Sequence, residues 1–320
     1  MARIPDTRTL ILSPLQALAR QHRERLLHLG IRLVERFDSE CSRGAQAMVT
    51  TPERLEHLLA QGFSITRDVL LVVDECHCIE QWGKGFRPSF SIIPSLVSRF
   101  ALKRSIWLSA TLPHSSRIAL RAALKSHIYE LGDFSTNPQT RITKLRVNWA
   151  HRPDFLRRFL QTEQTPGIVF SNTRAQSIAI GKLLSAWSET PESVSVYHAG
   201  LSREERLGVE SGIRAGRIQK ISATSAFGMG MDFPQIRWVI LWQVPYSILD
   251  LAQMIGRAGR NAGGSSLSFL LWDDSDFHHL RNHLSPEDLN SLKQAFESDA
   301  APQEALASFF GVEPNCEQLE

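Results

Sequence analysis

Short apolar runs alternate with longer amphipathic stretches along most of the chain. Residues 9–12, 47–50 and 69–73 have the length and composition of buried strands, and apolar residues at helical spacing follow each of them. Strands that alternate with helices in this way build parallel sheets covered by helices. The pattern therefore predicts an α/β fold, in which the five consecutive apolar residues 69–73 form a fully buried central strand.

Small polar residues and prolines mark the starts of several predicted helices. Ser13-Pro14 ends the first strand, and Ser13 is the predicted N-cap of the helix that follows. Thr51-Pro52 repeats the arrangement, and Ser202 to Glu205 has the spacing of a capping box. A free helix N-terminus can bind phosphate, although the residues around Ser13 favour an ordinary capped helix.

The rest of the chain continues the alternation. Further strands are predicted at 105–108, 145–149, 167–170, 194–197, 220–224, 238–242 and 267–272. Further helices are predicted at 92–100, 115–125, 154–161, 175–187, 249–260, 289–296 and 304–310. Residues 132–141, rich in Gly, Asp, Ser, Asn and Pro, interrupt the alternation and predict a domain boundary.

Composition restricts the class of protein without identifying it. Of the 320 residues, 42% are hydrophobic and 22% charged, as in globular proteins, and the net charge of +3 permits a polyanionic partner. Cys76 and Cys78 form a C-x-C pair without a second matching pair, so we predict no zinc site and a reducing, intracellular setting. Because no apolar run approaches the ~20 residues of a membrane span, no membrane association is predicted.

Two carboxylates follow the predicted central strand directly. Asp74 and Glu75 are placed at the carboxyl end of that strand, where open α/β sheets bind ligands. In nucleotide hydrolases such an Asp holds Mg²⁺ through its water shell, and the Glu orients the attacking water. The alternative is a strand that ends in a solvated acidic turn. The next loop weakens that alternative, because it carries side chains suited to base stacking and phosphate binding: Trp82, Phe86, Arg87 and Phe90.

A second candidate site lies near residue 257. Arg257 and Arg260 are three residues apart on a predicted helix and would project from one face. Small residues between them, such as Gly256 and Gly259, would let another surface approach closely. The two arginines are either a solvated patch or a pair that stabilises charge on a γ-phosphate, and local sequence leaves both interpretations open.

Several motifs in a fixed order are more specific than any one of them. The chain contains, in order, Ser-Pro-Leu, Thr-Pro-Glu-Arg-Leu, Asp-Glu-Cys-His, Ser-Ala-Thr, Tyr-His-Ala-Gly-Leu, Ala-Phe-Gly-Met-Gly and Gly-Arg-Ala-Gly-Arg. Over about residues 9 to 275 this order resembles the superfamily-two helicases, and the Cys-Ile-Glu-Gln-Trp-Gly-x-x-Phe-Arg-Pro loop resembles the RecQ-like DNA helicases.

The resemblance implies two tandem RecA-like α/β domains with parallel sheets, the first of them incomplete. The expected bounds are 1–133 for the first domain, 134–275 for the second, and 276–320 for a partial C-terminal extension, helical or irregular. One cysteine in this extension, Cys316, cannot make the four-cysteine zinc module that commonly follows in the family.

The resemblance also assigns roles to individual residues. Asp74 and Glu75 would bind Mg²⁺ through water and catalyse hydrolysis, and His77 would link the nucleotide site to the DNA path. Ser109 and Thr111 would couple the two domains. The implied ATP contacts are Asp74, Glu75, Asp232, Gln253, Arg257 and Arg260, of which the two arginines would also act catalytically. The implied DNA contacts are Ser13, Thr51, Arg54, Trp82, Phe86, Arg87, Phe90, Thr173, His198 and Thr224.

The sequence departs from the family pattern at three points. Cys76 stands where the family usually has Ala, and Phe233 stands where it often has a polar residue. The sequence also has no G-x-x-x-x-G-K-[ST], the loop that cradles the phosphates. We therefore expect an N-terminally truncated form that hydrolyses ATP poorly, with apolar surface exposed on residues 10–12 and on the central strand.

The function predicted from this resemblance is ATP-dependent 3′-to-5′ unwinding of DNA in recombination and repair. ATP and Mg²⁺ are the expected cofactors, and single-stranded and duplex DNA the expected partners. The expected compartment is the nucleus in a eukaryote and the cytoplasm or nucleoid in a bacterium. Two alternatives are a non-catalytic nucleic-acid-binding remnant of a helicase and an RNA-unwinding enzyme, against which the Trp82 loop argues.

Overall fold

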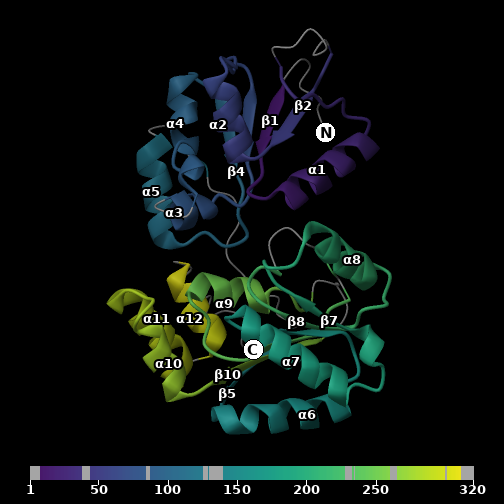
Figure 1. Ribbon diagram of the computed structural model, residues 1–320. Helices are drawn as coiled ribbons and strands as arrows, with labels where there is room; N and C mark the ends of the chain where they lie inside the picture. Colours follow the sequence, from purple (N-terminus) through teal and green to yellow (C-terminus); the bar gives the residue numbers. More distant parts are fainter. Residues whose placement is uncertain are drawn as a thin grey trace, which may run out of the picture. The chain divides into compact units, whose positions relative to one another are not determined.

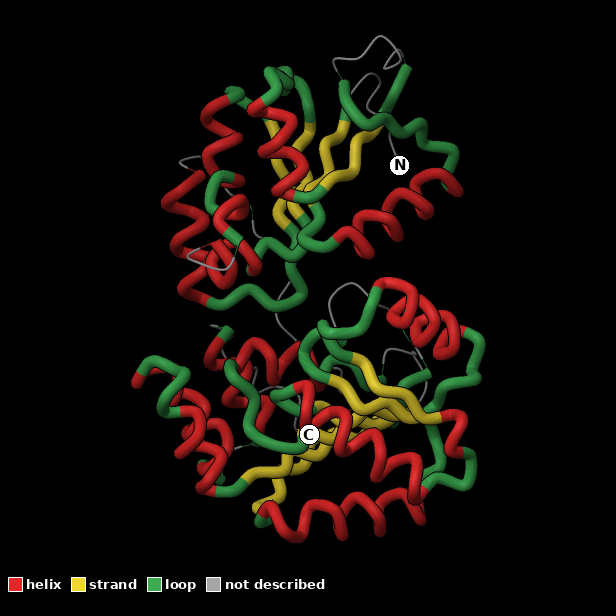
Figure 2. Tube along the Cα trace, in the orientation of Figure 1, coloured by secondary structure: helices red, strands yellow, loops and turns green. Residues whose placement is uncertain are grey.

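The computed structural model describes residues 8–37, 44–83, 87–124, 129, 140–227, 233, 235–259, 265–299 and 301–310, except for the side chains of 80–82, 287 and 308. The chain divides into two compact units, Met1–Gly132 and Asp133–Glu320. Each unit contains one sheet with helices beside it (Figures 1 and 2).

The sheet of the first unit is parallel throughout. Its strands are β1 (Thr9–Leu12), β2 (Ala47–Thr50), β3 (Leu70–Val73) and β4 (Arg104–Trp107), in the order β2-β1-β3-β4. The predicted interior position of β3 is confirmed, because it pairs with β1 on one side and β4 on the other. The predicted full burial of β3 is not confirmed, since Leu71 and Val73 are buried whereas Leu70 and Val72 are only half-buried.

The helices of the first unit begin close to the predicted positions, except α3 (Cys78–Gly83), which forms in a stretch predicted as a loop. They are α1 (Gln16–His28), α2 (Pro52–Ala60), α3 (Cys78–Gly83), α4 (Ile93–Arg99) and α5 (His114–Leu124). The predicted Ser13 cap is wrong: the Ser13 N–H still bonds to Thr50 O at the end of the β1–β2 ladder, so α1 starts later, with Leu15 at the N-cap. Thr51 does occupy the N-cap of α2, but its side chain makes no capping hydrogen bond.

Exposed apolar side chains at the sheet of the first unit lie on and just after β4, whereas they were expected on β1 and on the central strand β3. Leu10 and Leu12 are 0% and 1% exposed, because β1 is an interior strand of the described sheet. The prediction of an exposed β1 is therefore wrong. Ile106 on the outer strand β4 and Leu108 just after it are 45% and 47% exposed.

The second unit is built on a six-stranded parallel sheet. The order is β5-β10-β9-β6-β8-β7, formed by β5 (Thr140–Arg146), β6 (Gly167–Phe170), β7 (Val194–Tyr197), β8 (Lys220–Ala223), β9 (Trp238–Leu241) and β10 (Ser266–Trp272). Only β5 differs markedly from the prediction, since it starts and ends earlier. Asn148 explains the early end, because its side chain accepts a hydrogen bond from Ala150 N and starts a 3₁₀ turn.

Helices cover both faces of this sheet. On one face α6 (Arg152–Thr162) and α7 (Arg174–Trp187) pack against Val169 and Ile240. On the other, α8 (Arg203–Arg214) and α9 (Ile248–Ile255) pack against Ile168 and Phe170. Alternate residues of one strand thus enter two different cores, as expected of a strand buried on both sides.

The helix α9 ends before the candidate arginines. Its C-cap is Gly256, and Gly259, at φ 73°, donates its N–H to Ile236 O at 3.2 Å, so the chain turns back to the sheet. The predicted continuation of the helix to residue 260 is wrong, and Arg257 lies beyond the end of α9. Arg260 itself lies outside the described residues.

The last part of the chain belongs to the core of the second unit. It forms α10 (Asp274–Leu280), α11 (Pro286–Glu297) and α12 (Pro302–Phe309), of which α10 was not predicted. Leu292, Phe296 and Leu306 are buried against residues of α9 and the sheet. Among the helices that the structure describes, none has the length and apolar character that crossing a membrane requires.

Candidate functional site

The two candidate acids lie at the carboxyl edge of the first sheet. Asp74 donates its N–H to Leu12 O at 2.9 Å, which continues the β1–β3 ladder by one residue. Glu75 has φ 49°, a left-handed conformation that is uncommon outside glycine, and there the chain leaves the strand. Cys76 then bonds to Leu108 O at 2.9 Å, so strands on both sides hold the acidic pair in place.

Both carboxylate oxygens of Asp74 accept hydrogen bonds within the protein. His22 Nε2, on α1, lies 2.7 Å from Asp74 Oδ2, and Glu75 N donates to Oδ1 at 3.0 Å. Because a carboxylate only accepts, the imidazole is the donor. Sequence analysis did not identify His22, since 52 residues separate the two partners.

The donor set at this edge fits magnesium. Mg²⁺ in nucleotide sites is held by one or two carboxylates, with water and phosphate completing its shell. Asp74 and Glu75 supply two adjacent carboxylates, and across the described residues no group of three or more His, Cys, Asp or Glu side chains forms a protein cage for a metal ion. When bound, Mg²⁺ would supply positive charge that neutralises phosphate oxygens.

His77 connects Glu75 to the loop after β4. Its Nδ1 lies 2.9 Å from Ser109 Oγ and 3.3 Å from Glu75 Oε2. Ser109 Oγ donates to Thr111 O at 2.9 Å, so it can accept from a protonated His77 Nδ1. The network therefore favours neutral His77 with its proton on Nδ1, and it brings together four residues that the sequence had placed in two separate motifs.

Protonation of His77 is expected to destabilise the first unit. Burial of the ring lowers the pKa of His77 from 6.5 to about 4. The folded state therefore binds fewer protons than the unfolded state, so this stabilisation is complete above pH 6.5 and is lost as the pH falls to 4. The loss amounts to about 3 kcal/mol. Hydrogen exchange of peptides spanning β3, between pH 7 and pH 4.5, measures it.

The variant His77→Gln provides the control, because it removes the titrating group. It should be less stable at pH 7 yet show a smaller fall in protection with falling pH than the wild type. Parallel pH profiles for the two proteins would contradict this assignment to His77.

Arg87 and Phe90 are engaged within the protein. Arg87 Nε donates to Glu53 Oε1 and Nη1 to Pro14 O, both at 2.6 Å, while its Cζ lies 4.5 Å from the centroid of the Phe90 ring. Burial raises the pKa of Glu53, but the hydrogen bond and charge of Arg87, together with a backbone hydrogen bond, lower it by more, so that the net shift is downward. Phe90 is 2% exposed. These side chains tie their loop to α2 and to the turn before α1, and their contact with DNA stays a prediction.

The other predicted DNA contacts of the first unit lie after β1 and β2. Ser13 and Thr51 are buried, and within the described chain the Ser13 hydroxyl has no hydrogen-bond partner. Arg54 is more exposed, and its Nη2 donates to Glu35 Oε2 at 2.6 Å. Phe86 and the side chain of Trp82 lie outside the described residues.

Three predicted contacts of the second unit meet at one sheet edge. Thr173, His198 and Thr224 follow β6, β7 and β8, which are neighbours in the order β6-β8-β7. Thr224 N donates to Tyr197 O at 3.1 Å, which joins two of the three loops. His198 Nδ1 is buried without a hydrogen-bond partner among the described residues.

Gly200 lets Arg174 approach this edge. A Cβ at Gly200 would lie 3.0 Å from Arg174 Nη1 and 3.3 Å from His198 Nδ1, so any larger residue would displace one of them. The edge thus combines a guanidinium, an imidazole nitrogen and two hydroxyls. That set of groups suits an anionic oxygen ligand such as phosphate.

The predicted nucleotide contacts of the second unit are only partly described. Gln253 lies on α9, Arg257 lies just beyond its end and is buried, and Asp232 is outside the described residues. Phe233, the departure from the family pattern, is 4% exposed and stacks on Phe227 with ring centroids 5.4 Å apart. The phenylalanine at this position therefore fills the core.

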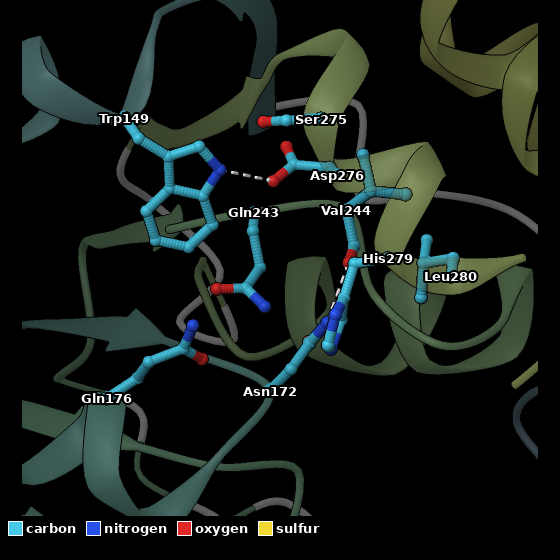
Figure 3. A pocket seen from close by; sticks show the side chains of 9 residues that line it. All are labelled: Trp149, Asn172, Gln176, Gln243, Val244, Ser275, Asp276, His279 and Leu280. Carbon is cyan, nitrogen blue, oxygen red and sulfur yellow. Dashed lines mark hydrogen bonds between the residues drawn. The ribbon is translucent and has the colours of Figure 1, made fainter. Parts of the chain in front are cut away.

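A cavity of about 240 Å³ opens beside the strand ends of the second unit (Figure 3). Its lining residues are Trp149, Asn172, Gln176, Gln243, Val244, Ser275, Asp276, His279 and Leu280. Gln176 Oε1 and Gln243 Oε1 are buried there, and neither has a partner in the described part of the chain. The cavity offers an aromatic wall and two free acceptors. Sequence analysis missed it, although Asn172 and Gln243 follow the strands β6 and β9.

A buried ion pair supports one wall of this cavity. Arg152 is 0% exposed, and its Nη2 lies 2.9 Å from Asp276 Oδ2. Asp276 also accepts from Trp149 Nε1 at 3.0 Å, as Figure 3 shows. Both members of the pair contact Trp149, since the guanidinium carbon of Arg152 also lies 4.2 Å from the Trp149 ring centroid.

Two family models match the chain, one in each unit. The DEAD/DEAH box helicase family matches residues 2–118, and the helicase conserved C-terminal domain matches residues 151–262. The first match contains the Asp74–Glu75 pair and the His77 network. The second contains the edge with Thr173, His198 and Thr224.

Relatives with high similarity are DNA helicases by name. The chain is 27% identical to the ATP-dependent DNA helicase RecQ of Pasteurella multocida, covering 95% of this chain and 51% of the relative. The chain is 29% identical to RecQ of Synechocystis, and the match covers 90% of this chain and 65% of the relative. Mouse WRN, a bifunctional 3′-5′ exonuclease/ATP-dependent helicase, is 33% identical over 71% of this chain and 16% of its own length. The chain thus spans about half to two thirds of the two bacterial relatives.

Solved structures share the fold. Yeast Dbp5 bound to RNA and ADP BeF3 matches with a TM-score of 0.67 at 21% identity, covering 92% of this chain and 76% of Dbp5. The helicase MrfA bound to DNA and AMPPNP also gives 0.67, at 20% identity, covering 89% and 44%. The predicted fold of two tandem RecA-like domains with parallel sheets is confirmed. The chain thus carries two helicase domains in tandem, and along most of its length it is similar to helicases of the RecQ family.

Proposed function

We propose that this chain belongs to the machinery of ATP-dependent 3′-to-5′ unwinding of DNA in recombination and repair, and that these 320 residues alone are deficient in ATP hydrolysis. The observation that carries the proposal is the bonded series from Glu75 through His77 to Ser109 and Thr111. This series connects Glu75, the acid that would orient water, with the loop that follows the neighbouring strand β4. A change at the nucleotide can therefore move a second segment of the unit.

The proposed nucleotide site uses the acidic pair and the motif near residue 257. Asp74 would hold Mg²⁺ through its water shell, and Glu75 would orient the water that attacks the γ-phosphate. Gln253 and Arg257, with Asp232 and Arg260 outside the described residues, would contact ATP. Arg257 and Arg260 would stabilise the developing charge.

The proposed DNA path runs along the carboxyl edges of the sheets. Ser13, Thr51 and Arg54 would contact phosphates in the first unit, and Thr173, His198 and Thr224 in the second. The His198 nitrogen supports this path, because it is buried, has no hydrogen-bond partner among the described residues, and can therefore bond to a ligand oxygen. Contacts of this kind bind the strand without reading its sequence.

The variant His198→Ala is expected to bind single-stranded DNA about 10-fold more weakly, the loss of one hydrogen bond to a charged group. Anisotropy of a labelled oligothymidine at several salt concentrations measures the affinity, and no ATP is needed. His151→Ala is the matched control, since His151 is an exposed histidine on a 3₁₀ turn of the same unit. Equal affinities for the two variants would contradict the proposed path.

One observation favours a second function, nucleic-acid binding without hydrolysis. The printed sequence has no phosphate-cradling G-x-x-x-x-G-K-[ST] motif, although the acids and the second-unit edge are present. An affinity for single-stranded nucleic acid that does not change when ATP is added would support this function. Unwinding of a DNA duplex, compared with an RNA duplex of the same sequence, would support the helicase and identify its substrate.

A further inference from the structure

We propose that His22 is a positioning residue for the magnesium-binding carboxylate Asp74. The proposal rests on the proposed function, in which Asp74 holds Mg²⁺. Its basis is the 2.7 Å contact from His22 Nε2 to Asp74 Oδ2. This contact joins α1 to the strand end that carries the acids.

The helix α1 presents His22 from an anchored position. Leu18, one turn earlier on the same face, is buried, and so is Ala19. The next residue, Arg23, donates from Nε at 3.1 Å and from Nη2 at 2.6 Å to Val49 O on β2. Side chains on both sides of His22 thus hold this part of α1 in place, and the imidazole extends from it to Asp74.

The two hydrogen bonds to Asp74 restrain its carboxylate and leave lone pairs on both of its oxygens. His22 holds Oδ2, and the Glu75 N–H holds Oδ1 at 3.0 Å. Each carboxylate oxygen accepts two hydrogen bonds, so each keeps a lone pair for a metal-bound water. The Asp74 and His22 side chains are 19% and 28% exposed, which leaves the carboxylate accessible from solvent. Without His22, the local bond from Glu75 would be the one restraint on the plane of the carboxylate that the described residues provide.

Outer-sphere partners of this kind contribute strongly to metal affinity. Their loss typically weakens binding 10- to 100-fold, because the ligand must then be ordered when the metal binds. A glutamine at position 22 keeps an N–H donor on a helix-compatible side chain, whereas an alanine removes it. The pair of variants therefore separates the hydrogen bond from any effect of the helix itself.

The test is Mn²⁺ binding by the full chain, followed by electron paramagnetic resonance without ATP turnover. We expect His22→Ala to weaken binding at least 10-fold and His22→Gln to weaken it less than 3-fold. His57→Ala, an exposed histidine on α2, should leave binding unchanged, and urea unfolding of each variant checks that the fold is kept.

Two results would overturn the proposal, and they differ in meaning. If Asp74→Asn abolishes Mn²⁺ binding but His22→Ala does not weaken it, His22 does not position the carboxylate, and the proposed function stands. If Asp74→Asn leaves Mn²⁺ binding intact, Asp74 is not the metal ligand, and both the proposed site and the role of His22 are refuted.

Discussion

Replacing Asp276 by leucine is expected to destabilise the second compact unit by about 3–5 kcal/mol, the usual cost of leaving one buried charge without its partner. Arg152 is 0% exposed, and Asp276 is its only charged partner among the described residues. Two carbonyls, Val147 O at 3.0 Å and Trp242 O at 2.7 Å, would remain, but neither carries the opposing charge. Urea unfolding followed by tryptophan fluorescence measures the loss.

The matched control is Asp274→Leu, two residues earlier in the same helix. Asp274 pairs with Arg146 on the surface, where both side chains are 62% exposed, so its replacement should cost at most about 1 kcal/mol. The double variant Arg152→Leu/Asp276→Leu should recover part of the stability lost in Asp276→Leu, because it no longer buries an unpaired cation. Equal losses for Asp276→Leu and Asp274→Leu would contradict the assigned role of the buried pair.

Local sequence was sufficient to predict most of the strands and helices, although not α3 or α10, and the sheet edges that carry the candidate sites. Short apolar runs such as 167–170 and 194–197 match β6 and β7 within their predicted bounds. A helix cap was predicted correctly where both residues of the capping box are present in the sequence. This is so at Ser202 and Glu205, whose reciprocal hydrogen bonds form the predicted capping box. Because parallel strands end at one edge, the residues after these strands could be grouped before any contact was known.

The side-chain partners could not be predicted in the same way. His22 and Asp74 are 52 residues apart, and Arg152 and Asp276 are 124 apart, so no periodic pattern relates the members of either pair. Errors at element ends have a similar cause. The end of α9 depends on the bond from Gly259 N to Ile236 O, and the late start of α1 on the bond from Ser13 N to Thr50 O.

The C-terminal segment shows the same limit of local reasoning. The family resemblance implied an extension beyond the second domain at 276–320, yet Leu292, Phe296 and Leu306 lie in the main core of the second unit. Lys144 on β5 donates to Ser298 O at 2.5 Å, at the end of α11. Sparse apolar residues can complete a core when a sheet face is available, and only the tertiary structure reveals that face.

A polypeptide of these 320 residues is expected to hydrolyse ATP at the background rate, with or without single-stranded DNA. Phosphoryl transfer is catalysed by positioning and charge stabilisation, and the G-x-x-x-x-G-K-[ST] loop supplies much of both. The described residues offer no substitute at the Gly181-Lys182 pair. Gly181 lies within α7, and a Cβ there would be 2.3 Å from Val196 Cγ2, so this glycine serves helix packing.

Measured phosphate release from ATP, in wild type and in Glu75→Gln, tests this expectation directly. A residual rate that is equal in both proteins is background, because Glu75 is the proposed water-orienting acid. A rate that DNA stimulates and that Glu75→Gln abolishes would contradict the prediction, since catalysis would then be achieved without the phosphate loop. DNA binding that persists in both proteins, with no turnover, would instead separate strand binding from hydrolysis and favour the non-catalytic function.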